Sequence, residues 1–102
     1  MIVYNTTFHA HGDIAEKFLV WLRGQFVPRA VADGRLAEPR LTLVLNAEES
    51  DGNNYSIQFR VVDIDTLQAW YSEIGDDLIV EMSQKFGRQA VGFSTLLQEM
   101  EL

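Results

Sequence analysis

Hydrophobic and polar residues alternate along several segments of the chain, and each of these segments is predicted to be a β-strand. The predicted strands cover residues 2–10, 40–45, 54–61 and about 89–100. In the first strand, Ile2, Tyr4 and Phe8 share one face, and Asn5, Thr7 and His9 share the other. The third strand repeats the arrangement, with Tyr55, Ile57, Phe59 and Val61 opposite Asn54, Ser56, Gln58 and Arg60. Both strands therefore have one apolar face, suited to a core, and one largely polar face.

Between the strands, apolar residues recur every three or four positions, the spacing of a helix with one buried face. The first helix is expected to be capped by the carboxylate of Asp13 and to stop at Gly34. Pro28 lies inside it, and because proline lacks an amide hydrogen, a kink or restart is expected at 25–27. The second helix is expected to be capped by Asp63 or Asp65 and to end at residue 87, a glycine. The polar stretch 48–54 predicts the loop of a hairpin, and its carboxylates lack the spacing of a calcium loop.

The predicted order is β-α-β-β-α-β, and the two halves are similar. Each helix carries one tryptophan, Trp21 or Trp70, and closes with Gly-Arg. Two right-handed βαβ units joined by a hairpin give a ferredoxin-like α+β sandwich, whose antiparallel four-stranded sheet has the order 4-1-3-2 with both helices on one face. No linker is visible, so residues 1–102 are predicted to form a single domain. The other face of the sheet would carry Asn5, Thr7, His9, Ser56, Gln58 and Arg60, with Val3, Val44 and Leu97 among them.

The composition narrows the classes of function. The chain has 8 Lys and Arg against 15 Asp and Glu, a formal net charge of −7. A surface of that charge repels phosphate backbones and anionic membranes, so neither nucleic acid nor a membrane is expected as a partner. Cysteine is absent, which excludes disulfides, thiolate zinc sites and cysteine catalysis. No signal peptide and no apolar run of roughly 20 residues is found, and we expect a soluble, cytoplasmic protein.

Three stretches, MIVYNTTFH, FLVWLRGQFVPRAVADGRL and STLLQEMEL, resemble a small family of bacterial proteins of uncharacterised function. The resemblance covers nearly the whole chain. It implies membership of the dimeric α/β-barrel superfamily, which includes antibiotic-biosynthesis monooxygenase-like enzymes, muconolactone-isomerase-like enzymes and stress-response barrel proteins. It also implies a homodimer with the two sheets face to face, and it transfers no catalytic residue. Haem-degrading members of the superfamily use a histidine on the second helix as the iron ligand; Asn5 and Trp70 match their pattern loosely, but no histidine follows His11.

The polar face of the sheet holds the candidate chemistry. His9, Asn5 and Arg60 are the candidate catalytic residues, because an imidazole exchanges protons near neutral pH and an arginine can hold a carboxylate or enolate. The same residues, together with Thr7 and Gln58, are the candidates for ligand binding. The alternative, which we favour, is that they only form hydrogen bonds across a dimer or to Glu99 and Glu101 of a neighbouring strand.

Other polar and aromatic residues are expected to have structural roles. His9-Ala10-His11 has the spacing of a metal site, but Gly12 follows at once and places His11 in a turn, so no metal is predicted. Trp21, Trp70 and Tyr71 are predicted to be core residues. The acidic residues of the second helix are expected to form its exposed face; they are Glu73, Asp76, Asp77 and Glu81.

Two hypotheses follow from these patterns. The preferred one is a non-catalytic homodimer that binds a small ligand or a protein partner without a cofactor. Its apolar tail, from Phe93 to Leu102, is predicted to be ordered and to pair at the dimer edge. The alternative is a cofactor-independent monooxygenase or isomerase that acts on a small anionic substrate, and it requires His9 and Arg60 to converge on one cavity.

Overall fold

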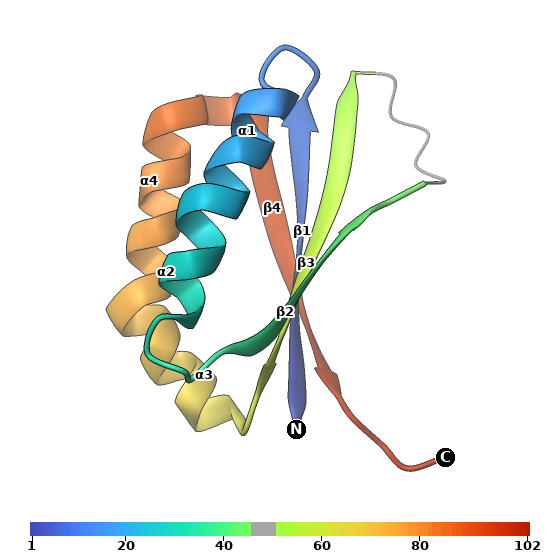
Figure 1. Cartoon of the computed structure of the whole chain (residues 1–102), viewed down its shortest axis with the longest axis vertical. Helices are drawn as coiled ribbons and strands as arrows, with labels where there is room; N and C mark the ends of the chain where they lie inside the picture. Colours follow the sequence, from blue (N-terminus) through green and yellow to red (C-terminus); the bar gives the residue numbers. More distant parts are fainter. Residues whose placement is uncertain (46–50) are drawn as a thin grey trace.

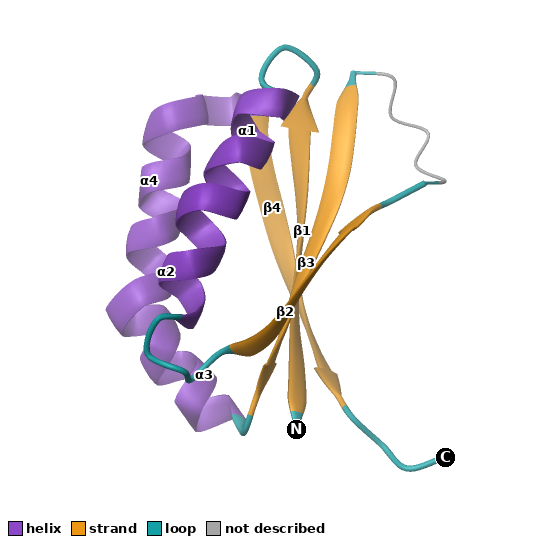
Figure 2. Cartoon of the chain, viewed as in Figure 1, coloured by secondary structure: helices purple, strands orange, loops and turns teal. Residues whose placement is uncertain are grey.

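The computed structural model describes residues 1–45 and 51–102, and its elements follow the predicted order (Figure 1). Strands β1 (Ile2–His11), β2 (Ala37–Leu43), β3 (Gly52–Val61) and β4 (Ala90–Gln98) form one antiparallel sheet in the order β2-β3-β1-β4. This is the predicted 4-1-3-2 order counted from the other edge. All helices lie on one side of the sheet (Figure 2), which confirms the ferredoxin-like α+β sandwich. The tip of the predicted hairpin, 46–50, lies outside the described residues.

The register of the sheet decides which side chains share a face. Asn5 lies opposite Gln58 of β3 and Thr95 of β4, while Thr7 lies opposite Ser56 and Phe93. Directly opposed residues of an antiparallel pair point to the same side. The uncovered side, called the open face below, therefore carries Val3, Asn5, Thr7, His9, Arg40, Thr42, Val44, Asn54, Ser56, Gln58, Arg60, Val91, Phe93, Thr95 and Leu97. This assignment confirms the two-sided strands that the alternation predicted.

The covered side of the sheet forms a core rich in aromatic rings. Phe8 is fully buried and packs against Phe18 and Phe26 of the first helical segment (residues 15–31), with ring centroids 5.4 and 5.6 Å from its own. Gly92 lies opposite Phe8 on β4, where an added Cβ would stand 2.7 Å from the ring. The absence of a side chain at this position thus gives the Phe8 ring its space.

The strand β4 ends at residue 98, two residues before the predicted end.

The first helical segment consists of α1 (Ala15–Trp21), a π-helical turn η1 (Leu22–Phe26) and α2 (Val27–Val31). In η1 the Val27 amide donates to the carbonyl of Leu22, five residues back. Pro28 follows at once, so the expected irregularity at 25–27 is confirmed. The predicted Asp13 cap is wrong, because β1 continues to His11 and the following turn places Ile14 at the capping position, where no side chain caps the helix. The helix also ends at residue 31, and Gly34 adopts a positive φ of 84° in the turn beyond it.

The second helical segment has the same construction: α3 (Ile64–Trp70), a π-helical turn η2 (Tyr71–Gly75) and α4 (Asp76–Phe86). The cap by Asp63 is confirmed, since its Oδ1 accepts the Thr66 amide at 2.8 Å, and this bond lowers the pKa of the carboxyl. Residue 87 ends α4 with a φ of 57°, as expected. The second π-turn was not predicted. The expectation that Tyr71 belongs to the core is wrong, since this residue, the first of the π-turn, is 40% exposed.

The two tryptophans connect the helical segments to each other. The Trp70 indole Nε1 donates to the carbonyl of Ala30 at 2.9 Å, and the Trp21 Nε1 donates to Glu81 Oε2 at 2.8 Å. Arg29 also donates to Glu81, at 2.8 Å. Glu81 therefore lies half-buried between the helices, and its expected place on the exposed face is wrong. Among the described residues, no helix is long and apolar enough to cross a membrane.

Candidate functional site

One end of the open face contains His9 with two polar partners. Its Nδ1 lies 2.7 Å from Asn54 Oδ1, and its Nε2 lies 3.3 Å from Asp51 Oδ1. An acceptor oxygen therefore lies near each ring nitrogen, and a neutral imidazole, which has a single N–H, donates to one of the two. The ring borders a hollow of about 450 Å³, whose apolar walls include Val91 and Phe93 of β4.

The middle of the open face carries uncharged polar groups that bond to one another. The Asn5 side-chain amide donates to Thr7 Oγ1 at 3.4 Å, and the hydroxyl of Ser56 donates to Asn5 Oδ1. Gln58 lies directly opposite Asn5 in the register. Because these bonds lie within the chain, Asn5, Thr7 and Ser56 keep them when another surface covers this part of the face.

The other end of the open face contains Arg60 between two carboxylates. Its guanidinium lies 2.7 Å from Glu99 Oε1 and 2.8 Å from Glu38 Oε2. Hydrogen bonds to Glu99 first, and to Glu38 second, raise the pKa of Arg60. The pairing with Glu99 is the one expected from the sequence. A hollow of about 420 Å³ adjoins these groups, and Val3 and Arg40 also line it.

The candidate catalytic residues do not come together within one chain. His9 lies opposite Asn54, whereas Arg60 lies opposite Val3, six positions away along β1. At about 3.3 Å per residue, this separation is about 20 Å. The convergence that the enzyme hypothesis requires is therefore missing within the single chain, where each of the two residues borders a different hollow.

The second histidine also lies elsewhere than expected. His11 belongs to β1, paired with Gly52, and not to the turn. Its Nδ1 accepts the Asp13 backbone amide at 3.2 Å and lies 3.7 Å from the carboxylate of the same residue. In the described part of the chain, no group of three His, Asp or Glu side chains is arranged to hold a metal ion.

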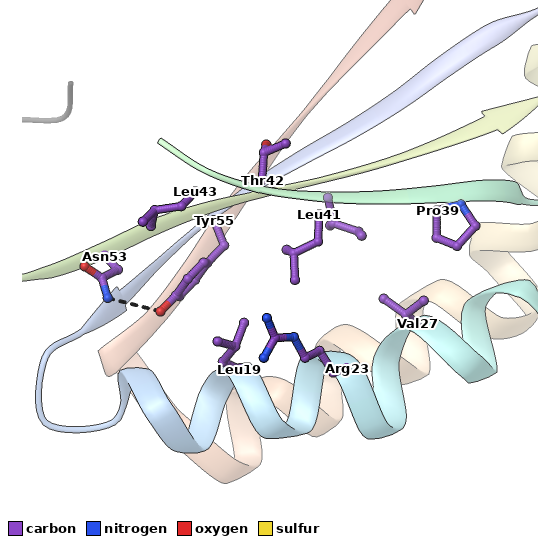
Figure 3. A pocket seen from close by; sticks show the side chains of 10 residues that line it. Leu19, Arg23, Val27, Pro39, Leu41, Thr42, Leu43, Asn53 and Tyr55 are labelled. Atoms are coloured by element: carbon purple, nitrogen blue, oxygen red, sulfur yellow. Dashed lines mark hydrogen bonds between the residues drawn. The ribbon is translucent and has the colours of Figure 1, made fainter. Parts of the chain in front are cut away.

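The sequence analysis missed a groove on the helical side of the sheet. The groove has a volume of about 610 Å³ and lies between the first helical segment and the edge strand β2 (Figure 3). Leu19, Arg23 and Val27 line it from the helix, and Leu41 and Tyr55 line it from the sheet. The four-residue spacing of the three helical residues was a usable signal, because side chains at i, i+4 and i+8 share one side of a helix.

A second groove lies at the opposite edge of the sheet, beside β4. It has a volume of about 630 Å³ and no charged lining residue; Tyr4, Leu67, Gln68, Tyr71, Ser72, Ser94 and Leu96 line it. The two grooves correspond in the two halves of the fold, since each includes residues of a π-turn, Arg23 in η1 or Tyr71 and Ser72 in η2.

The strand order and the helices on one face define the class of protein: a ferredoxin-like α+β domain. Within that class, the chain belongs to the family described as domain of unknown function DUF4286, whose model matches residues 1–100. None of the curated proteins matches the sequence.

Three solved structures are similar to this one. A protein described as a dimeric ferredoxin-like protein from an uncultured marine organism has a TM-score of 0.73 at 14% identity, covering 99% of this chain and 97% of that one. A proposed antibiotic biosynthesis monooxygenase from Deinococcus radiodurans has a TM-score of 0.73 at 12% identity, covering 100% and 95%. A protein described as a member of the EthD family, from Bacillus halodurans, has a TM-score of 0.71 at 14% identity, covering 98% and 100%. At these identities the similarity establishes the fold.

Proposed function

We propose that this protein is a homodimeric, non-catalytic binding module, whose two copies meet through the open face of the sheet. The observation that carries the proposal is the apolar part of that face. Phe93 is 66% exposed, Val91 52% and Leu97 46%, and all three lie on β4 beside β1. Exposed apolar side chains gathered on one surface are typical of an interaction site. The similar structure described as dimeric supports a second copy as the occupant.

The size of the open face is sufficient for a stable dimer. Strands of nine or ten residues extend about 30 Å, and four strands side by side are about 19 Å wide. Two such faces in contact bury on the order of 1,200 Å² or more in total, because side-chain relief adds to the flat area. Stable protein interfaces begin near this value.

The charged groups at the two ends of the face support this arrangement. Arg60 is paired with Glu38 and Glu99, and His9 contacts Asp51 and Asn54 within the same chain. A second copy would then cover Arg60 together with its carboxylates rather than an unpaired cation, whose burial is costly. The same pairing is the reason for preferring a non-catalytic role, since both candidate catalytic side chains already have partners.

The experiment is light scattering on the wild type and two variants. The 11.6 kDa chain is expected to have twice this mass in solution, and Phe93→Asp is expected to be monomeric because it places a charge at the centre of the apolar strip. Val20→Asp is the matched control, since Val20 is 72% exposed but lies on a helix away from the sheet. Circular dichroism verifies that each variant is folded. A monomeric wild type, or a dimeric Phe93→Asp, would overturn the proposal.

The alternative function is a cofactor-independent monooxygenase or isomerase acting on a small anionic substrate. One observation favours it: the hollow beside His9 has apolar walls and opens on the face that a second copy would close. A thermal-shift screen of small carboxylic acids tests it with the wild type and His9→Ala. A compound that stabilises the wild type, is chemically changed by it, and does neither with His9→Ala would favour the enzyme. Stabilisation without turnover agrees with the binding module.

A further inference from the structure

The groove beside β2 has the shape and lining of a small-molecule site. Leu19 and Val27 are half-buried and face Leu41, also half-buried, across the groove (Figure 3). The Tyr55 ring is buried, and its hydroxyl accepts the Asn53 side-chain amide at 3.1 Å, which fixes its position. Volumes of about 300–1,000 Å³ with mostly apolar walls are usual for ligand sites, and this groove has about 610 Å³.

A single cation lies among these apolar walls. Arg23 is exposed, is presented by the π-turn η1, and extends from the helix toward β2 between Leu19 and Val27 (Figure 3). It makes no ion pair with any of the described residues, whereas Arg29, Arg35 and Arg60 each contact a carboxylate. π-turns occur frequently at functional sites. Within the described part of the chain, the guanidinium therefore has no carboxylate partner at a position where most of the surrounding groups are apolar.

We propose that the groove between the first helical segment and β2 binds a small amphipathic carboxylate. Arg23 holds the carboxylate, for which the guanidinium fork offers two parallel hydrogen bonds. Leu19, Val27 and Leu41 contact its alkyl or aryl body. The inference rests on the proposed function, because it names the ligand class of the binding module and places the ligand on the helical side, away from the dimer face.

The charge distribution favours this groove over the others. With a net charge of −7, most of the surface repels an anion, so a carboxylate requires a cation that is not already neutralised. The groove beside β4 is as large and as apolar but has no charged lining residue. The hollow at Arg60 contains two carboxylates, Glu38 and Glu99, which balance the charges of Arg60 and Arg40 there. A third hollow, between the two helical segments, has Lys17 and Lys85 at its border and is the main competitor for an anion.

The experiment is an NMR titration of the ¹⁵N-labelled full chain with two probes that share one body, octanoate and the uncharged octanamide. Octanoate is expected to shift the amide signals of 19–27, 37–43 and 53–57. Arg23→Gln is expected to weaken octanoate about tenfold and to leave octanamide unchanged, because only the charged bond is lost. Arg88→Gln, an exposed arginine that borders none of the hollows described above, is the matched control and should bind both probes like the wild type.

Three outcomes would overturn the inference: no octanoate binding to the wild type at millimolar concentration, equal octanoate affinity of Arg23→Gln, or shifts centred on the β4 groove or on Lys17 and Lys85. Light scattering separates this result from the proposed dimer. If the protein is dimeric but does not bind octanoate, the proposed groove site is rejected and the proposed dimer is not. Octanoate binding to a monomeric wild type supports the groove and rejects the dimer.

Discussion

Glycine 75 should be far less replaceable than glycine 24, although both lie inside π-turns of corresponding helices. An added Cβ at Gly75 would lie 2.5 Å from Cζ3 and 2.9 Å from Cη2 of Trp70, and 2.9 Å from Cδ2 of Tyr71. At Gly24 no atom outside the local helix backbone lies within 4 Å of such a Cβ. The pair therefore separates the effect of tertiary packing from the intrinsic helix preference of alanine.

The expected loss of stability in Gly75→Ala depends on how tightly the Trp70 side chain is held. The indole is only 1% exposed and donates to the Ala30 carbonyl at 2.9 Å, so it cannot move without disturbing the core or this bond. Overpacking costs about 1–3 kcal/mol, and weakening the buried hydrogen bond costs about 1 kcal/mol more. Alanine returns about 0.5–1 kcal/mol through its helix preference. Gly75→Ala should thus lose about 1–3.5 kcal/mol, whereas Gly24→Ala should gain about 0.5–1 kcal/mol.

Urea unfolding followed by tryptophan fluorescence measures both variants, at one protein concentration because a dimer makes stability concentration-dependent. For a domain of this size, each 1 kcal/mol corresponds to roughly 4–8 °C in Tm, so thermal melts provide a second readout. Opposite signs for the two glycines are the expected result. A Gly75→Ala protein as stable as the wild type, or two variants that change in the same direction, would refute the packing argument at Trp70.

Two further predictions concern polar groups on the helices. The hydrogen bond from Trp21 first, and that from Arg29 second, lower the pKa of Glu81 below the usual 4.5. The stability that the Glu81 carboxylate contributes is therefore complete above that pH and is lost as the pH falls through the lowered pKa. Glu81→Gln should make the loss of stability from pH 7 to pH 3 less steep, as measured by urea unfolding. Asp63→Ala removes the acceptor of the Thr66 amide and should lower Tm by several degrees, whereas Asp65→Ala should change it less. An unchanged pH slope or equal Tm values would contradict the respective assignment.

Much of the fold could be predicted because the relevant signals are local. Alternation in β1 and β3 identified the core face, since successive strand residues must point to opposite sides. The Asp63 cap and the glycine after α4 were also predictable, because each depends on a few neighbouring backbone groups. The Asp13 cap failed because the length of β1 depends on pairing between His11 and Gly52, a contact 41 positions apart by their numbers.

The candidate site was predictable in composition but not in geometry. Every residue that the sequence assigned to the open face lies there, although Val91 and Phe93 were not among them, and the contact of Arg60 with Glu99 was expected. The distance between His9 and Arg60 was not predicted, because periodicity shows on which face of the sheet a residue lies but not its position along the strand direction. The groove at Arg23 was not predicted either, because it forms only where β2 lies beside the first helical segment.

By itself, the sequence determined the order of elements, the two faces of the strands and the side of the sheet that the helices cover. Those properties follow from hydrophobic spacing, which every segment carries independently of the rest. Only the tertiary structure decided most of the polar contacts: Glu81 with Trp21, Arg60 with Glu38, and no ion pair of Arg23 with any of the described residues. Such pairings depend on strand register and on the π-turns that shift side chains around each helix, and these are settled by packing between distant segments.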